Sequence, residues 1–282
     1  MKKFARLLFL AILLIPSLLV AEEPAPPAEA PIPVPLTLPF NINVVSVGTA
    51  DNYFNMGTDR IKAKEYCAFL NAVASKTDLH HLYNPKTAPA TKSKTNDGKT
   101  VIIGQGDDRV ANITRTQNED KTFSYTVAPG SRKIPETDAI VANEDLPITH
   151  VSLMSAARFC NWMHNGQGGP ETTETGAYAL DETVKPVFQT ITLQPGARWR
   201  LPTQDEWILF YSQYSQYDAT PSCWEWTMTP HELAQNPLPG HSHYGTYVQV
   251  GGASFEPRYN NGRPDQVCAS FDTGFRVVPA AQ

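Results

Sequence analysis

The chain has 282 residues, of which 41% are hydrophobic and 10% aromatic, and its 23 Lys and Arg against 28 Asp and Glu give a formal net charge of −5. Such a composition can bury a core, which excludes a wholly disordered or collagen-like chain. The acidic balance argues against a nucleic-acid partner, because phosphate binding requires clustered Lys and Arg.

The first 21 residues do not have the pattern of a globular element. Three basic residues within the first six positions precede an apolar run from Leu7 to Val20, which only Pro16 and Ser17 interrupt. This pattern predicts a secretory signal peptide and not a membrane span. We therefore expect an extracytoplasmic protein, whether periplasmic, cell-surface or secreted, with a membrane as partner only if the signal stays uncleaved.

Residues 22–39 form a second segment without globular character, since seven of these positions are proline. Such a segment cannot form a helix or a strand ladder, and it favours extended polyproline II structure. We expect a semi-rigid linker here, followed by one globular domain over residues 40–282.

The domain is predicted to open with a strand and a helix. The strand covers Asn41–Gly48, which alternates and is rich in Val and Ile. In the helix, Thr58 or Asp59 is available as the N-cap, because side-chain oxygens at that position accept from free backbone N–H groups. The apolar positions with near-helical spacing are Ile61, Tyr66, Phe69, Leu70 and Val73.

A long polar stretch, Thr77–Leu146, follows this helix. Two alternating runs within it, RVANITRT and KTFSYTVA, flank the turn-prone sequence QNED and predict a β-hairpin. His80 and His81 stand at the start of the stretch, and we expect both to be solvated.

The second helix is predicted in SLMSAARFCNWMHNG, where Ser152 can cap the start and Gly166 can end it. A third helix follows Thr203, which stands three residues before Glu206 in the pattern of a capping box. Two further strands are predicted in TYVQVGGASF and TGFRVVPA. Few helices, many short strands and long irregular connections predict an α+β fold.

The four cysteines are Cys67, Cys160, Cys223 and Cys268. In an exported protein an even number permits two disulfides, with three possible connectivities. The alternative for Cys67 and Cys160, which lie on apolar stripes, is a buried free thiol that packs as a small apolar side chain. No CxxC pair occurs, so a zinc ribbon or thioredoxin-type site has no support.

Five phrases occur together in the order and spacing of one family. The chain resembles the formylglycine-generating enzyme family, also called sulfatase-modifying factor domains. The phrases are PITHVSLMSAARFCNWM (Pro147–Met163), RLPTQDEW (Arg200–Trp207), CWEWT (Cys223–Thr227), VGGASF (Val250–Phe255) and GFRVV (Gly274–Val278). The resemblance implies a C-type-lectin-like fold with little regular secondary structure, with Phe275 and Val277 alternating inward on a closing strand.

The resemblance also implies where the chemistry of the enzymatic members would lie. Those members carry two cysteines shortly after the GGS phrase, which bind copper(I) and engage the substrate cysteine. Counting from GGAS, the equivalent positions hold Glu256 and Asn261, which are hard oxygen ligands, so copper is not expected. Cys268 stands alone beyond them. In the same relatives the cysteine at Cys160 is bridged to one at Val277, so we expect Cys160 to be reduced and buried.

A calcium site of the enzymatic relatives has its counterpart in Asp218 and Glu225. Two carboxylates with backbone carbonyls suit this hard cation. The alternative is that Glu225 is a satisfied structural residue between two tryptophans.

These features favour an exported, catalytically degenerate domain that acts as a binding or interaction module for a peptide, protein or glycan. The competing hypothesis is an enzyme, either a copper-dependent formylglycine-generating oxidase that activates sulfatases or another metal-dependent activity. The candidate binding pocket consists of charged and amide side chains, namely Glu256, Arg258, Tyr259, Asn260, Asn261 and Arg263.

Overall fold

The computed structural model describes residues 42–49, 52–87, 91–94, 100–103, 113–134, 138–180, 191–214, 223–230, 247–251, 258–259 and 273–280. All of them belong to one compact unit, Thr37–Gln282. Of the helices in these ranges, none has both the length and the hydrophobicity needed to cross a bilayer.

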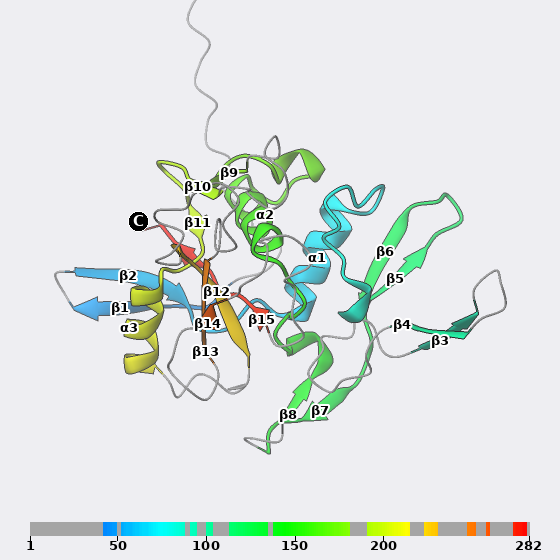
Figure 1. The fold of residues 1–282 in the computed structure, drawn as a ribbon, viewed down its shortest axis with the longest axis horizontal. Coiled ribbons are helices and arrows are strands. Elements are labelled where there is room, and N and C mark those ends of the chain that lie inside the picture. Colours follow the sequence, from blue (N-terminus) through cyan, green and yellow to red (C-terminus); the bar gives the residue numbers. More distant parts are fainter. Residues whose placement is uncertain are drawn as a thin grey trace, which may run out of the picture. The chain divides into compact units, whose positions relative to one another are not determined.

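Three α-helices and several short strands make up this unit (Figure 1). The helices are α1 (Ala63–Val73), α2 (Leu153–His164) and α3 (Gln204–Tyr214), and three 3₁₀ turns are η1 (Pro85–Thr87), η2 (Asn143–Asp145) and η3 (Pro170–Thr172). The strands of the first half are β1 (Val44–Thr49), β2 (Asn52–Gly57), β3 (Thr91–Lys94), β4 (Thr100–Ile103), β5 (Ile113–Gln117), β6 (Phe123–Val127), β7 (Ser131–Lys133) and β8 (Ile140–Ala142). Those of the second half are β9 (Tyr178–Leu180), β10 (Ile191–Leu193), β11 (Trp199–Arg200), β12 (Trp224–Pro230), β13 (Tyr247–Gly251), β14 (Arg258–Tyr259), β15 (Thr273–Gly274) and β16 (Val278–Pro279).

The strands pair locally in most cases. Two-stranded antiparallel sheets join β1 to β2, β3 to β4, β5 to β6, β7 to β8 and β9 to β10. A four-stranded sheet has the order β14-β13-β12-β15, in which β15 runs parallel to β12. The mixture of helices and short, mainly antiparallel strands confirms the predicted α+β class.

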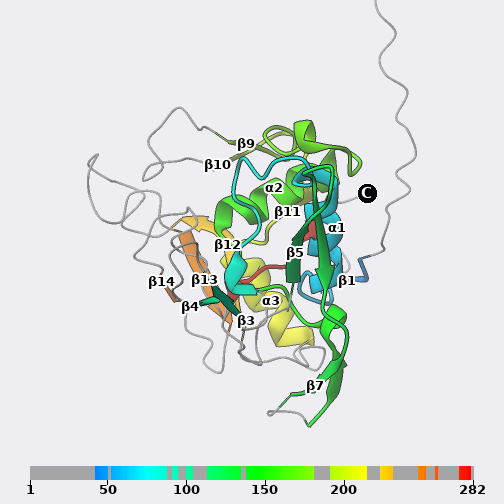
Figure 2. The same cartoon turned by 90° about the vertical axis from the view of Figure 1, so that its right-hand side faces the viewer.

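The core between α1 and α2 is aromatic. The rings of Tyr66 and Phe69 on α1 lie 5.3 Å apart, and Phe159 on α2 lies 5.4 Å from Phe69 and 5.3 Å from Phe275. Ring pairs at these distances contribute beyond their buried area. A smaller core cluster, which includes Met56, Trp207 and Val278, forms where α3 packs on β1 (Figure 1). The turned view in Figure 2 shows α1 and α2, the two helices of the larger core, next to each other.

Several predicted elements are confirmed. The predicted hairpin consists of β5 and β6, which the turn QNED connects, and Thr114 lies opposite Thr126 in it. Ser152 caps α2 by accepting from the Ser155 N–H at 3.1 Å. Thr203 and Glu206 form the capping box of α3, since each backbone N–H donates to the other side chain, at 2.8 and 3.2 Å.

The predicted N-cap of the first helix is wrong. The helix begins after Lys62, not after Thr58 or Asp59. Residues 58–62 are not helical, because their backbone is bonded elsewhere: the Ile61 N–H donates to Phe275 O at 2.9 Å, and Lys62 bridges to Pro147.

The tail was predicted as one alternating strand, and this is also wrong. It forms two strands with different partners, since β15 pairs with β12 and β16 pairs with β11. Arg276, between them, is only 1% exposed, so Phe275, Arg276 and Val277 are all buried. The alternation fails because a buried carboxylate binds the Arg276 guanidinium.

Candidate functional site

The predicted binding pocket falls largely outside the described residues. Glu256, Asn260, Asn261 and Arg263 lie there, as do Asp218 and Cys268. Arg258 and Tyr259 form β14, which pairs with β13 at the edge of the four-stranded sheet. The pocket therefore stays a prediction. The structure adds that two of its residues, Arg258 and Tyr259, lie on the edge strand of the sheet.

Glu225 on β12 is the centre of a buried charge cluster. Arg276 makes a two-pronged contact with it, Nε to Oε2 at 2.6 Å and Nη2 to Oε1 at 2.9 Å. Arg60 donates from Nε to Oε1 at 3.1 Å. Burial opposes ionisation of Glu225, but the charges of Arg276 and Arg60 outweigh it and lower its pKa.

This arrangement bears on the predicted calcium ion at Asp218 and Glu225. Both carboxylate oxygens of Glu225 already accept from guanidinium groups, whose positive charges would repel a cation at the same carboxylate. Within the described ranges, no cluster of three or more His, Cys, Asp or Glu side chains could hold a metal. The surroundings of Glu225 therefore do not fit calcium as arranged, and the two-residue site stays a prediction.

The described thiols are all buried, and none of them forms a disulfide. They are Cys67 at 7%, Cys160 at 0% and Cys223 at 7% exposure. Burial raises the pKa of Cys67 to about 11 and raises that of Cys160 further. The prediction of a reduced, buried Cys160 is confirmed, and neither Cys67 nor Cys160 has the lowered pKa of a reactive thiol.

A pocket of about 250 Å³ lies between the end of α1, the loop 77–82 and η3. Its walls are apolar where Val73, Leu82 and Pro170 line it, and Asp78 and Glu171 add carboxylates. Small concave sites with apolar walls and a few polar groups are the usual form of ligand pockets.

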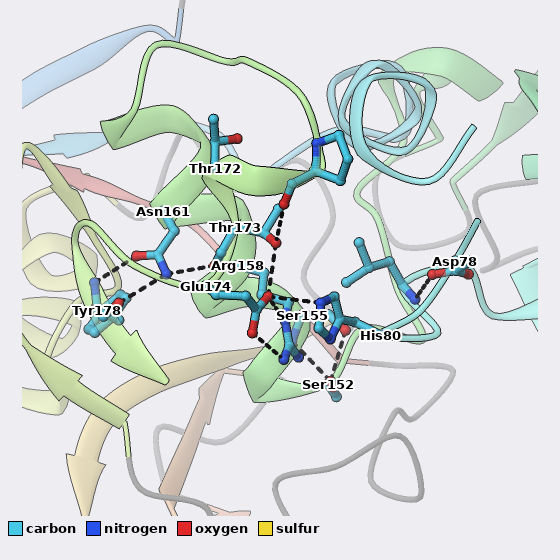
Figure 3. A network of polar contacts seen from close by, with 12 residues as sticks. Asp78, His80, Ser152, Ser155, Arg158, Asn161, Thr172, Thr173, Glu174 and Tyr178 are labelled. Atoms are coloured by element: carbon cyan, nitrogen blue, oxygen red, sulfur yellow. Dashed lines mark hydrogen bonds and ion pairs between the residues drawn. The ribbon is translucent and has the colours of Figure 1, made fainter. Parts of the chain in front are cut away.

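A polar network fixes one side of this pocket (Figure 3). Arg158 on α2 binds Glu174 with two hydrogen bonds, at 2.7 and 2.9 Å. His80 Nε2 lies 3.1 Å from the same carboxylate. Burial opposes ionisation of Glu174, but the Arg158 contacts outweigh it and lower the pKa. Asn161 on α2 extends the network by donating to Thr173 O at 2.7 Å.

Of the two histidines expected to be solvated, His81 is exposed, whereas His80 is half-buried, since its side chain is 22% exposed and contacts Glu174. No pattern in the sequence pairs His80 and Glu174, which lie in loops far apart in the chain. The one local signal was the pair Asp78 and Leu82: the Asp78 carboxylate accepts the Leu82 N–H at 2.6 Å, as aspartate does at turns.

Comparison with known proteins now identifies the class. A family model described as the sulfatase-modifying factor enzyme 1-like domain matches residues 46–209. The chain therefore belongs to this family, as the shared phrases indicated. Neither the comparison with curated proteins nor that with solved structures gave a match.

Proposed function

We propose that the chain is an exported member of this family that has lost oxidase activity and binds a peptide, a protein or a glycan. The observation that carries the proposal is the pair Glu256 and Asn261 at the positions where enzymatic relatives have thiols. Carboxylate and amide groups neither bind copper(I) well nor form a mixed disulfide with a substrate cysteine.

The buried thiols support the same proposal. Cys67, Cys160 and Cys223 are held inside the domain, so none of them is available as a surface ligand pair. The C-type-lectin-like arrangement belongs to the proposal too, because such scaffolds carry variable loops that suit a binding role. Export rests on the charged and apolar pattern of residues 1–21.

The test is an oxidase assay. The purified protein is incubated with copper, oxygen and a Cys-x-Pro-x-Arg peptide, and mass spectrometry follows conversion of the cysteine to formylglycine. We expect no product. A product that disappears in Cys268→Ser would overturn the proposal and support the competing hypothesis, a copper-dependent oxidase with a relocated thiol.

A further inference from the structure

The pocket between loop 77–82 and η3 has a size and a chemistry that define its occupant. Its volume, about 250 Å³, lies just below the range of about 300–1,000 Å³ typical of sites for drug-sized molecules. A single long side chain fits this space better than a whole cofactor or sugar chain.

The lining has an uneven charge. Among the described residues that line the pocket, Asp78 and Glu171 are acidic, none is a Lys or Arg, and His80 is the one basic side chain. Arg158 lies behind the lining at 4% exposure, where Glu174 binds both prongs of its guanidinium. The pocket therefore offers negative charge to an occupant.

Both lining carboxylates have acceptor capacity left. A carboxylate can accept about four hydrogen bonds. Asp78 accepts from two backbone groups, the N–H of Leu82 at 2.6 Å and that of Tyr83 at 3.0 Å. Glu171 accepts from the Gly169 N–H at 3.2 Å. The existing bonds hold the two groups in place and leave lone pairs for a ligand.

The apolar walls supply the other half of the recognition. Val73, Leu82 and Pro170 can cover an alkyl stem, and Leu79 at 75% exposure stands at the surface beside them. Lys and Arg side chains combine such a stem with a cationic end, and they bury the stem along apolar surface. Apolar surroundings also strengthen the attraction between the cation and the carboxylates.

We propose that this pocket binds one lysine or arginine side chain of a peptide, with the stem between Val73, Leu82 and Pro170 and the cation at Asp78 and Glu171. The inference goes beyond the proposed function, because it assigns a ligand class to a site formed by other residues than 256–263. Network contacts from His80 and Glu174 keep the pocket formed before the ligand arrives.

The test uses the full chain with ¹³C-labelled Val and Leu methyl groups, titrated with lysine blocked at both ends. We expect saturable shifts of the Val73, Leu79 and Leu82 signals and no shift of the core residue Leu153. Blocked arginine should shift the same signals. Blocked norleucine, which has the stem without the cation, should bind about three- to fivefold more weakly, as expected for one partly exposed ion pair.

Two variants and a control make the test decisive. Glu171→Gln should weaken lysine binding toward that of norleucine while Asp78 keeps part of the difference, and Thr77→Trp, at an exposed lining position, should remove binding of both. Glu119→Gln, an exposed glutamate in the β5–β6 turn, should change nothing. Equal binding of lysine and norleucine, unchanged affinity in Glu171→Gln, or no saturable shift with any probe would overturn the proposal. None of these outcomes affects the oxidase assay, so the two proposals can fail separately.

Discussion

Glu225 shows how one residue can hold three distant segments. Arg60 precedes α1, Arg276 separates β15 from β16, and the Arg276 Nη1 also donates to the carbonyls of Gly57 and Thr58, both at 3.0 Å. Two guanidinium groups around one carboxylate leave an excess positive charge inside the domain. Cation–π contact with Phe210, 4.4 Å from the Arg276 guanidinium carbon, helps to accommodate it.

The first prediction concerns this cluster. Glu225→Gln should lower the free energy of unfolding by about 3–5 kcal/mol, because it leaves two buried guanidinium groups without an anion. Arg60→Met should cost less, because the Glu225–Arg276 pair then remains as a neutral unit. Urea denaturation of both variants measures the order. A smaller loss for Glu225→Gln than for Arg60→Met would contradict this account of the cluster.

For single residues, the sequence predicts which side chains are buried better than it predicts which side chains contact one another. The apolar stripe around Cys160 predicted burial, because periodicity reports which side of a helix faces the core, and Val277 at the position of the family's partner cysteine predicted a free thiol. Glu225 was assigned to either calcium or a structural role, because a single sequence does not show that Arg60 and Arg276 converge on it. Long-range ion pairs leave no periodic pattern.

Among the elements, α3 has the clearest N-terminal capping. Glu206 takes part twice, since its carboxylate accepts from the Thr203 N–H and also from Arg200 Nη1 at 2.7 Å. The helix presents Trp207, at 1% exposure, to the cluster around Met56 and Val278. The first turn of α3 therefore contains both the capping residues and the tryptophan that packs the helix against the core.

The second prediction tests this cap. Thr203→Ala should lower the free energy of unfolding by about 1 kcal/mol, because the Glu206 N–H loses its side-chain acceptor. Thr203→Ser keeps the hydroxyl and should cost clearly less. Thermal melts of the two variants measure the difference, and equal losses would show that the methyl group and not the cap is responsible.

Local signals explain which elements were predictable. The hairpin β5–β6 and the caps of α2 and α3 depend on residues within a few positions of each other, so their patterns are visible in the sequence. The start of α1 and the division of the tail depend on each other instead, through the Ile61–Phe275 hydrogen bond. Such mutual constraints become visible only in three dimensions.

At the scale of the whole molecule, the described carboxylates that contact arginine contribute to the response to acid. Glu174, Glu206 and Glu225 all have a pKa below the ordinary value of 4.5, because their arginine contacts outweigh burial. Burial raises the pKa of Glu65 above 4.5, which acts in the opposite direction. Among the described residues, these three carboxyls and Asp120, whose pKa is lowered by its hydrogen bonds to Thr122, outnumber Glu65.

The third prediction follows from linkage. A carboxyl with a lowered folded-state pKa contributes stability above its unfolded-state pKa and loses that contribution as the pH falls through the folded-state value. The free energy of unfolding should therefore decrease as the pH falls below about 4.5. Glu206→Gln, which removes one titrating group, should show a weaker decrease. Urea denaturation from pH 7 to pH 3 is the measurement, and a flat profile would contradict the assignment.

The candidate sites were predictable to different degrees. The family and the substituted thiol positions follow from phrases of contiguous sequence. The 250 Å³ pocket does not, because loop 77–82 and η3 come from segments about 90 positions apart and carry no shared motif. A contiguous phrase can reveal ancestry, whereas a pocket depends on how loops are packed.

The position of the tail in the core also determines when the domain can close. Residues 273–280 bond to the segment after β2, to β11 and to β12, and a Cβ on Gly274 would lie 2.4 Å from Ile148 O, so this part of the chain is fitted closely between elements made earlier. During synthesis these residues leave the ribosome after all of their partners. Until then Phe275 is missing from the aromatic core and Glu225 lacks Arg276, so neither the core nor the charge cluster can be completed before the last residues are made.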